Sequence, residues 1–324
     1  MPDNKKLTRK VKQMAHELGF PLVGVTSADP PGHLDFFRAW LASGYQASMD
    51  WMGSEQSLER RADPKAILPE CKSILALGSP YPAPRGNPKG GNIAAYALNR
   101  DYHDVLEKRL QALVGKLEEW VGEPVPNRWY TDTGPILEKE LAQRAGLGWI
   151  GKNTTLINRN FGSYFFLSEI LLGIELITDS PNTESFCGSC SRCLETCPTG
   201  ALLTPYTLDA NRCISYLTIA HREEIPTELR PLMGDWIFGC DICQIVCPWN
   251  KPDSETPSIL EEFLPREELL AIDLTNELNL SQTEFSAKFT GSPVKRAKYS
   301  GYLRNVANAL GNLSKNNQKA QTED

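Results

Sequence analysis

The sequence contains no apolar run that approaches the roughly 20 residues needed to span a bilayer as a helix. It also lacks the pattern of a signal peptide, because no apolar segment follows the basic start, MPDNKKLTRKVKQ. Cysteine is nearly absent outside one segment, since eight of the 9 cysteines lie between positions 187 and 247. We therefore expect a cytoplasmic protein, in which crowded cysteines indicate a metal or cluster site rather than disulfides.

The sequence has no excess of basic charge. Its formal net charge is -6, which disfavours indiscriminate binding to nucleic acid or to anionic membranes. Net charge is a global property, whereas contacts with RNA are local, so a basic patch that binds RNA is still compatible with it. A composition that is 41% hydrophobic and 23% charged is ordinary for a soluble globular protein.

The pattern of apolar residues divides the chain into three predicted parts. Residues 1–177 are predicted to form an α/β-like domain with a central sheet flanked by helices, because helical and strand patterns alternate there. Turn-forming residues then introduce the cysteine-rich part, 178–255. Residues 256–324 are predicted to be helical with a disordered tail. The fold class expected for the whole chain is α+β. The predicted helices of the first part are 7–18, 36–45, 103–121 and 136–145, and its predicted strands are 22–25, 73–77, 129–131 and 163–172.

The cysteines form a motif that occurs twice. The run C-G-S-C-S-R-C-L-E-T-C-P at 187–198 has the C-x₂-C-x₂-C-x₃-C-P spacing of bacterial ferredoxins, in which the last cysteine binds the second cluster. The run C-D-I-C-Q-I-V-C-P at 240–248 is a second copy without its first cysteine, and Cys213 can supply the missing thiolate. The predicted ligands are Cys187, Cys190, Cys193 and Cys247 for cluster one, and Cys197, Cys213, Cys240 and Cys243 for cluster two.

Zinc is the alternative occupant of a cysteine-rich site. Zinc sites usually pair two C-x₂-C units, so the third closely spaced cysteine and the Cys-Pro ending favour 4Fe–4S clusters. The ninth cysteine, Cys71, precedes a predicted strand and is interpreted as a core residue. Because each cluster passes one electron, two neighbouring clusters indicate electron transfer.

Several longer segments resemble one known family. They are Arg100-Asp-Tyr-His103, TDTGPILEKELAQRAGLGWIGKNT from Thr131, GSYFFLSE from Gly162, DANRCISYLTI from Asp209, ELRPLMGDWIFGCDICQIVCPWN up to Asn250, and GSPVKRAKYSGYLRNVANALGN near the end. Together with the ferredoxin run they cover nearly the whole chain. They are similar to those of epoxyqueuosine reductases, the cobalamin-dependent enzymes that complete queuosine on tRNA.

The resemblance implies a reaction, its cofactors and its partners. The substrate would be epoxyqueuosine at the wobble position of a tRNA anticodon, whose epoxide loses its oxygen to give the alkene of queuosine and water. Two electrons and two protons are consumed. Two 4Fe–4S clusters would supply electrons singly to cobalamin, the cofactor that performs the difficult chemistry. An external donor such as a flavodoxin or ferredoxin system and a monomeric state are expected with it.

The resemblance places the family's proton donor at Asp132, in the segment Y-T-D-T-G-P. A carboxylic acid beside an epoxide oxygen can protonate the leaving alkoxide. Local sequence alone favours another role, because Asp before Thr-Gly-Pro at a strand-to-helix turn is a good helix cap. The two roles conflict, since a helix N-terminus lowers a carboxyl pKa whereas an acid that works near neutral pH needs its pKa raised.

Cobalamin binding has no sharp local signature. The D-x-H-x-x-G motif that supplies a histidine to cobalt is absent, because Leu106 occupies its glycine position, and His103 is interpreted as a packed or capping residue. A solvated charge is the alternative for Arg61 and Lys152, and a hydrogen bond within its own loop is the alternative for Asp241. By resemblance the cobalamin contacts are Arg61, Asp132, Lys152, Asn153, Ser215 and Asp241.

A basic stretch without acidic residues lies near the end of the chain. Lys295, Arg296 and Lys298 are the predicted tRNA contacts. Basic residues with aromatic residues between them suit phosphate contact and base stacking, although a charge cluster is commonly a solvated face. The neighbours that share this interpretation are Lys288, Tyr299, Tyr302 and Arg304.

Three other functions fit parts of the sequence. One is a reductive dehalogenase-like enzyme, but such enzymes usually carry an export signal and use a hydroxyl-bearing acid where this chain has Asp132. Another is a plain electron carrier, for which corrin absorbance would be absent. The third is an RNA-binding protein with structural clusters, which would bind RNA without redox turnover.

Overall fold

The computed structural model describes residues 3–83, 87, 90–250 and 259–323, with side chains up to residue 315. A four-stranded sheet lies at its centre, and every neighbouring pair of strands in it is antiparallel. The predicted α/β-like part therefore has an antiparallel sheet, which places the chain in the α+β class as predicted. In spatial order the strands are β1 (Leu22–Ser27), β2 (Ser73–Pro80), β7 (Phe165–Leu172) and β4 (Asn127–Tyr130).

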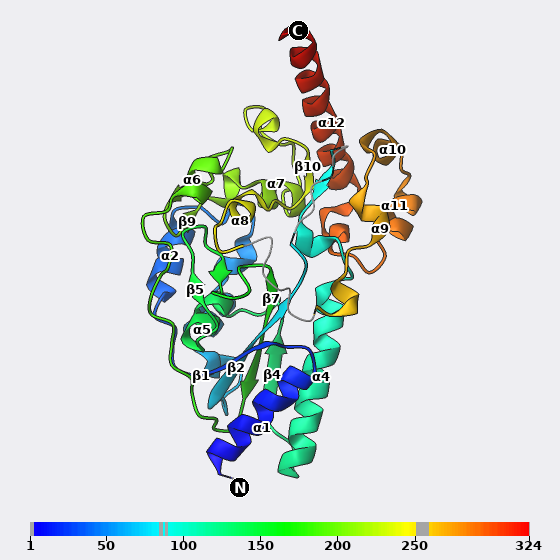
Figure 1. The fold of residues 1–324 in the computed structure, drawn as a ribbon. Helices are drawn as coiled ribbons and strands as arrows, with labels where there is room; N and C mark the ends of the chain where they lie inside the picture. The colour runs from blue at the N-terminus through cyan, green and yellow to red at the C-terminus, as the bar shows by residue number, and fades with distance from the viewer. Residues whose placement is uncertain (1–2, 84–86, 88–89, 251–258, 324) are drawn as a thin grey trace.

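Helices cover both faces of this sheet (Figure 1). On one face α1 (Asn4–Glu17) and α4 (Tyr102–Val121) pack against each other, and their apolar residues share a core with Phe166 of β7. On the other face α5 (Glu138–Arg144) packs near Phe165 and Leu171 of the same strand. Alternate residues of β7 thus enter opposite cores, as the two-residue period of a strand requires.

The helices and strands predicted for residues 1–177 are confirmed, with ends that differ by a few residues. Cys71 is also confirmed as a core residue: it is 2% exposed, and burial raises the pKa of its thiol to about 11. The remaining short elements of this part are α2 (Leu34–Ala42), α3 (Glu55–Ala62), β3 (Asn92–Ile93), β5 (Trp149–Ile150) and β6 (Leu156–Ile157).

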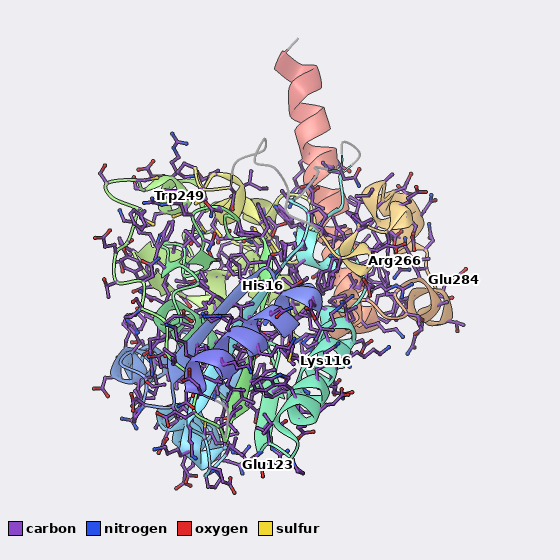
Figure 2. The ribbon with its side chains drawn as sticks, turned by 60° about the horizontal axis from the view of Figure 1, so that its bottom comes forward. His16, Lys116, Glu123, Trp249, Arg266 and Glu284 are labelled. Atoms are coloured by element: carbon purple, nitrogen blue, oxygen red, sulfur yellow. The ribbon has the colours of Figure 1, made fainter. Side chains whose placement is uncertain are left out.

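The cysteine-rich part consists of short elements separated by loops. Figure 2 shows α1 with His16 across the front, Trp249 of the cysteine-rich part above it on one side, and Arg266 on the other side. In chain order these elements are α6 (Arg192–Thr196), β8 (Leu202–Thr204), β9 (Thr207–Leu208), α7 (Ile214–Ile219), β10 (Trp236–Phe238) and α8 (Ile242–Ile245).

The C-terminal region is helical as predicted, and the disorder of its last residues stays a prediction. The last helix continues to Glu323, so that it projects from the body of the molecule (Figure 1). The tail contains Ala, Gln and Lys, which favour helix, and neither Gly nor Pro after Gly311. The helices of the region are α9 (Glu267–Leu270), α10 (Leu274–Leu278), α11 (Gln282–Lys288) and α12 (Lys298–Glu323).

Hydrophobic cores cross the predicted domain limits. Strand β3 pairs in parallel with β10, although more than a hundred residues separate them. One core combines Leu98 with Phe238 and with Tyr302 of α12. The predicted limit between 255 and 256 lies outside the described residues, and the three-part division stays a prediction. Among the described residues, no helix combines the length and apolar character that crossing a membrane requires.

Candidate active site and cluster centre

A cavity of about 750 Å³ lies where the sheet, the cysteine-rich part and the C-terminal region meet. Phe165 and Phe166 of β7 supply part of its apolar lining, and Cys213 lines it as well. Lys295 and Arg296 also line it, and both are exposed to solvent. The cavity thus joins an apolar wall, a predicted cluster ligand and basic residues in one space.

Asp132 extends its carboxyl group into this cavity. Its backbone has a left-handed φ of 56°, which is uncommon for a residue other than glycine, and its side chain is 56% exposed. The Tyr102 hydroxyl donates a hydrogen bond to Oδ2 at 2.7 Å. Gly134 permits the turn, because a Cβ atom there would lie 2.5 Å from Cγ of Tyr130. The loop therefore holds the carboxyl group at the cavity in a defined position.

The interpretation of Asp132 as a helix cap is wrong. Helix α5 begins at Glu138, its N-cap residue is Leu137, and no side chain caps it. Asp132 lies six residues before the helix. The local sequence misled because the turn that follows the strand is longer than a direct strand-to-helix connection.

His103 lies beside Asp132 rather than in a packed core. Its Nδ1 is 2.7 Å from Oδ1 of Asp101, so Nδ1 donates to that carboxylate, and Nε2 is 3.9 Å from Oδ2 of Asp132. Asp101, and not His103, caps α4 by accepting from the backbone N–H of His103. His103 is thus packed, since its ring stacks on that of Tyr102, but it is not the cap, and its place beside Asp132 was missed.

Two further carboxyl groups lie near Asp132. Glu138 accepts the backbone N–H of Asp132 at 2.8 Å, and burial together with the charge of Asp132 raises the pKa of Glu138 to about 8. Glu169 of β7 is fully buried, and burial raises its pKa well above the ordinary value. Burial likewise raises the pKa of Tyr102, with Asp132 adding to the effect, so Tyr102 remains a hydrogen-bond donor.

Lys139 is the cation next to this group of acids. Its Nζ donates to the carbonyl oxygen of Thr154 at 2.7 Å. Lys139 lines the cavity and is exposed there. The protein around its ammonium group still removes part of its hydration, and this desolvation lowers the pKa of Lys139. Sequence reasoning missed Tyr102, Glu138, Lys139 and Glu169 as residues of the site.

The predicted ligands of cluster one surround a common space. That space is a small cavity of about 70 Å³ between the two cysteine motifs. Among the described residues, no three His, Cys, Asp or Glu side chains converge as around a single metal ion. A four-iron cluster holds its thiolates farther apart than one zinc ion does. The cysteines that line the cavity are Cys187, Cys190, Cys193 and Cys247.

The predicted ligands of cluster two lie close enough to one another for their charges to interact. Burial raises the pKa of the Cys240 thiol, and the charges of Cys213 and Cys243 raise it further. Burial raises that of Cys213 as well, with a contribution from Cys197. Cys213, a predicted ligand of cluster two, also lines the large cavity that contains Asp132.

Of the remaining predicted cobalamin contacts, one lines the large cavity and the others hold the loops around it. Ser215 lines the large cavity, as Asp132 does. Asp241 is 1% exposed and accepts the backbone N–H of Ala95 at 2.7 Å, and burial raises its pKa to about 6. Asp241 therefore links the cysteine-rich part to the segment after β3, and it also accepts from Gln244 within its own loop at 3.3 Å.

Lys152, Asn153 and Arg61 lie outside the lining of the large cavity. Lys152 donates from Nζ to the carbonyl oxygen of Cys190 at 2.9 Å, and Asn153 donates to that of Cys243 at 3.3 Å. Both therefore hold the cysteine loops. Arg61 stacks over the ring of Phe37 at 5.3 Å from its centroid, donates to two backbone carbonyls, and is close enough to Glu138 for their charges to interact.

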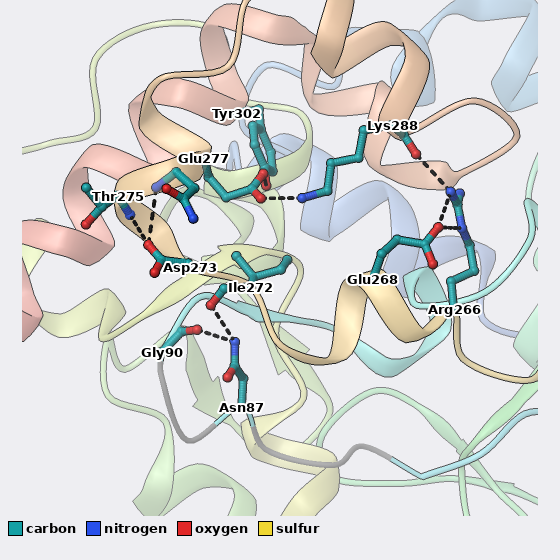
Figure 3. A network of polar contacts seen from close by, with 11 residues as sticks. Asn87, Gly90, Arg266, Glu268, Ile272, Asp273, Thr275, Glu277, Lys288 and Tyr302 are labelled. Atoms are coloured by element: carbon teal, nitrogen blue, oxygen red, sulfur yellow. Dashed lines mark hydrogen bonds and ion pairs between the residues drawn. The ribbon is translucent and has the colours of Figure 1, made fainter.

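The basic stretch separates into exposed and structural residues. Lys295, Arg296 and Lys298 are exposed. Lys288 forms an ion pair with Glu277, which also accepts from the hydroxyl of the fully buried Tyr302 at 2.7 Å (Figure 3). The prediction that Tyr302 serves base stacking is therefore wrong.

Arg304 and Tyr299 have structural contacts as well. Arg304 donates to the carbonyl oxygens of Leu217 and His221, at 2.7 and 3.1 Å, and Tyr299 donates to that of Leu280 at 2.7 Å. Among the described side chains, three of the seven predicted residues make no such contact, and they are the three predicted to contact tRNA.

Comparison with known proteins agrees with this arrangement. Residues 186–250 match the family model of a 4Fe-4S double cluster binding domain, and residues 61–133 match that of epoxyqueuosine reductase QueG. The epoxyqueuosine reductase of Pseudomonas aeruginosa is 42% identical over 318 residues, which cover 96% of this chain and 87% of that protein. The chain belongs to the epoxyqueuosine reductase family. It is accordingly an oxidoreductase with a double-cluster 4Fe–4S domain, and the zinc and plain-carrier interpretations are set aside.

Solved structures of the family share the fold. An epoxyqueuosine reductase with an epoxyqueuosine-modified tRNA-Tyr stem loop superposes with a TM-score of 0.87 at 32% identity, covering 96% of this chain and 82% of that one. The enzyme from Bacillus subtilis, described with its catalytic aspartate loop swung out of the active site, superposes with a TM-score of 0.86 at 32% identity and the same coverage.

Proposed function

We propose that this epoxyqueuosine reductase converts epoxyqueuosine to queuosine at the wobble position of tRNA, with Asp132 as the general acid. The observation that supports this most is the carboxyl group of Asp132 in a cavity that cluster-two ligand Cys213 and the basic residues Lys295 and Arg296 also line. An acid, an electron source and a surface for phosphates thereby meet in one place. The relative with a bound stem loop has the same fold.

The lining of this cavity suits cobalamin. Aromatic side chains, among them Tyr96, Phe165 and Phe166, line much of it and would offer an apolar surface to the corrin ring. Ser215 would contact the cofactor directly, while Arg61, Lys152, Asn153 and Asp241 would hold the loops around it. When bound, cobalamin would supply a strongly reducing, nucleophilic cobalt centre. His103 is engaged with Asp101 and faces Asp132, which agrees with the absence of a histidine ligand motif.

The protein's own residues would bind the substrate and control its protons. Asp132 would give a proton to the oxygen that leaves carbon, and Tyr102 and His103 would orient its carboxyl group. Electrons from an external donor, such as a flavodoxin or ferredoxin, would reach cluster one and then cluster two, the nearer to the cavity. Lys295, Arg296 and Lys298 would contact tRNA phosphates. We place this activity in the cytoplasm, in a monomer.

Replacing Asp132 by Asn tests the acid. The Asn side chain keeps its size and can still accept from Tyr102, but it cannot give up a proton, and losing a general acid costs about 10²–10⁴ in rate. The measurement is single-turnover reduction of an epoxyqueuosine-containing stem loop by chemically reduced, cobalamin-loaded enzyme, so that electron delivery is not limiting.

Asp104→Asn is the matched control, because Asp104 is exposed on α4. Both variants should load clusters and cobalamin normally. Near-normal turnover by the Asp132 variant would refute its assignment as the acid.

A further inference from the structure

A buried carboxyl group lies in the sheet next to the strand that leads to Asp132. Glu169 of β7 is paired with Tyr130, the last residue of β4. It belongs to the side of β7 whose residues Leu167 and Leu171 pack near α5. Its exposure is 0%, and neither of its carboxyl oxygens has a hydrogen-bond partner among the described residues. Nothing in the reaction outlined above uses this group.

Ionising a carboxyl group in such a place requires a large free energy. Burial of a carboxylate without a partner is compensated by proton uptake rather than tolerated as a charge. The groups that act on Glu169 besides burial are Glu138 and Asp132, and both are acids, so each raises its pKa further. Burial and the two neighbouring acids therefore all favour the neutral, protonated form of Glu169.

Glu138 is more exposed than Glu169 and less exposed than Asp132, which lines the cavity. It is half-buried, its Oε1 accepts the N–H of Asp132, and its pKa of about 8 keeps it largely protonated at pH 7. Opposing charges lower this pKa without cancelling the effect of burial. The titratable and charged groups that interact with Glu138 are Asp132, Glu169, Tyr102, Lys139 and Arg61.

The proposed reaction consumes more protons than one acid holds. Both carbon–oxygen bonds of the epoxide break, a carbon–carbon double bond forms, and the oxygen leaves as water with two protons and two electrons. Asp132 holds at most one proton. An RNA stem loop over the cavity would restrict solvent, so a proton held inside the protein would reach Asp132 more readily than one from bulk water.

We propose that Glu169 and Glu138 form a proton reserve that recharges Asp132 within one turnover. Asp132 protonates the oxygen when the first carbon–oxygen bond breaks, and Glu138 then passes its proton to Asp132. Glu169 replaces the proton of Glu138, and the recharged Asp132 protonates the oxygen as it leaves as water. The two electrons come through the clusters, and two protons return from solvent after product release. This inference rests on the proposed function, and both glutamates act through Asp132.

Glu169→Gln tests the reserve in the cluster-loaded and cobalamin-loaded protein. The neutral Gln matches the shape of the neutral carboxyl group, so folding, iron content and cobalamin content should not change. Single-turnover reduction of the modified stem loop should slow by about tenfold or more, because solvent must now supply a proton. A small acid such as formic acid should restore the rate of the variant and leave the wild type unchanged. A structural role would not respond to added acid.

Two measurements keep the inference falsifiable if that variant folds poorly. Infrared difference spectra should show a protonated carboxyl band at neutral pH that Glu169→Gln or Glu138→Gln removes. The reduction rate of the Glu138→Gln enzyme should no longer depend on the protonation of a group with a pKa of about 8. Glu175→Gln, an exposed site just beyond β7, is the matched control and should resemble the wild type in both measurements.

Wild-type rates and an unchanged pH profile in both Gln variants, or an ionised Glu169 at neutral pH, would overturn the reserve. This failure is distinguishable from failure of the proposed function. If Asp132→Asn is slow and Glu169→Gln is fast, only the proton reserve is refuted. If Asp132→Asn is fast, the assignment of Asp132 as the acid is refuted.

Discussion

Replacing Glu138 by Gln should stabilise the folded protein at neutral and alkaline pH. In the unfolded chain this carboxyl group titrates near its ordinary value of 4.5, whereas burial and Asp132 raise its pKa to about 8 in the fold. Between these values the unfolded state loses the proton first, so the free energy of unfolding falls as pH rises. A Gln side chain has no such proton and keeps an oxygen that can accept the N–H of Asp132.

The size of the effect follows from the shift in pKa. At about 1.4 kcal/mol per pKa unit, the full shift would lower the free energy of unfolding by about 5 kcal/mol above pH 8. Glu138 is only half-buried, and Arg61 and Lys139 offset part of the unfavourable environment. We therefore expect Glu138→Gln to gain about 1–3 kcal/mol at about pH 8.5, and close to nothing at about pH 4.

Denaturant unfolding of the anaerobic, cluster-loaded protein measures this gain. The unfolding midpoint of wild type and variant should coincide at acidic pH and separate as pH rises, with the variant more resistant. Glu175→Gln should follow the wild type at every pH, because Glu175 is exposed. A variant that is no more stable than the wild type at about pH 8.5, or a gain that does not depend on pH, would refute the reasoning.

Two further predictions concern the clusters and the RNA. Cys213→Ala should lower the iron content after anaerobic reconstitution from about eight to about four per chain, because Cys213 is a predicted ligand of cluster two alone. Replacing Lys295, Arg296 and Lys298 together by Ala should weaken stem-loop binding and flatten its dependence on salt, because phosphate contacts release counterions.

Each of these variants has a matched control in the same chain. Cys71→Ala removes a buried cysteine that no cluster is predicted to use, so iron content should stay at the wild-type level. Replacing Lys5, Lys6 and Arg9 of α1 by Ala removes the same charge from an exposed helix face. Zinc in place of iron, or equal salt dependence of the two triple variants, would contradict the corresponding assignment.

The helices, the strands and the double-cluster domain could be predicted because their signals are local. Cluster ligands follow a spacing that the chain must adopt to wrap a cube of iron and sulphur, and apolar periodicity identifies helix faces. The same periodicity also carried a signal that was missed. Tyr302, Val306 and Ala309 recur at helical spacing and are all fully buried, which excludes Tyr302 from base stacking.

The acids around Asp132 could not be predicted from spacing, because three separate elements bring them together. Asp132 follows β4, Glu138 begins α5, and Glu169 lies within β7, so only the sheet register makes them neighbours. One signal did exist. Glu169 interrupts the apolar strand FFLSEILL, and an ionisable residue in a strand predicted to be central is rarely buried without a functional reason.

The group of acids is easier to explain by proton supply than by stability. Among the described residues Glu169 has no hydrogen-bond partner, and Glu138 accepts the N–H of Asp132. The charge of Glu138 also raises the free energy needed to ionise Glu169. An apolar side chain in place of Glu169 would pack against α5 without any such cost. The proposed reaction, which takes up two protons in a cavity that RNA would cover, gives these carboxyl groups a use that packing does not. The stability gained by Glu138→Gln and the rate lost by Glu169→Gln therefore test two sides of one arrangement, in which the fold gives up stability to hold protons beside Asp132.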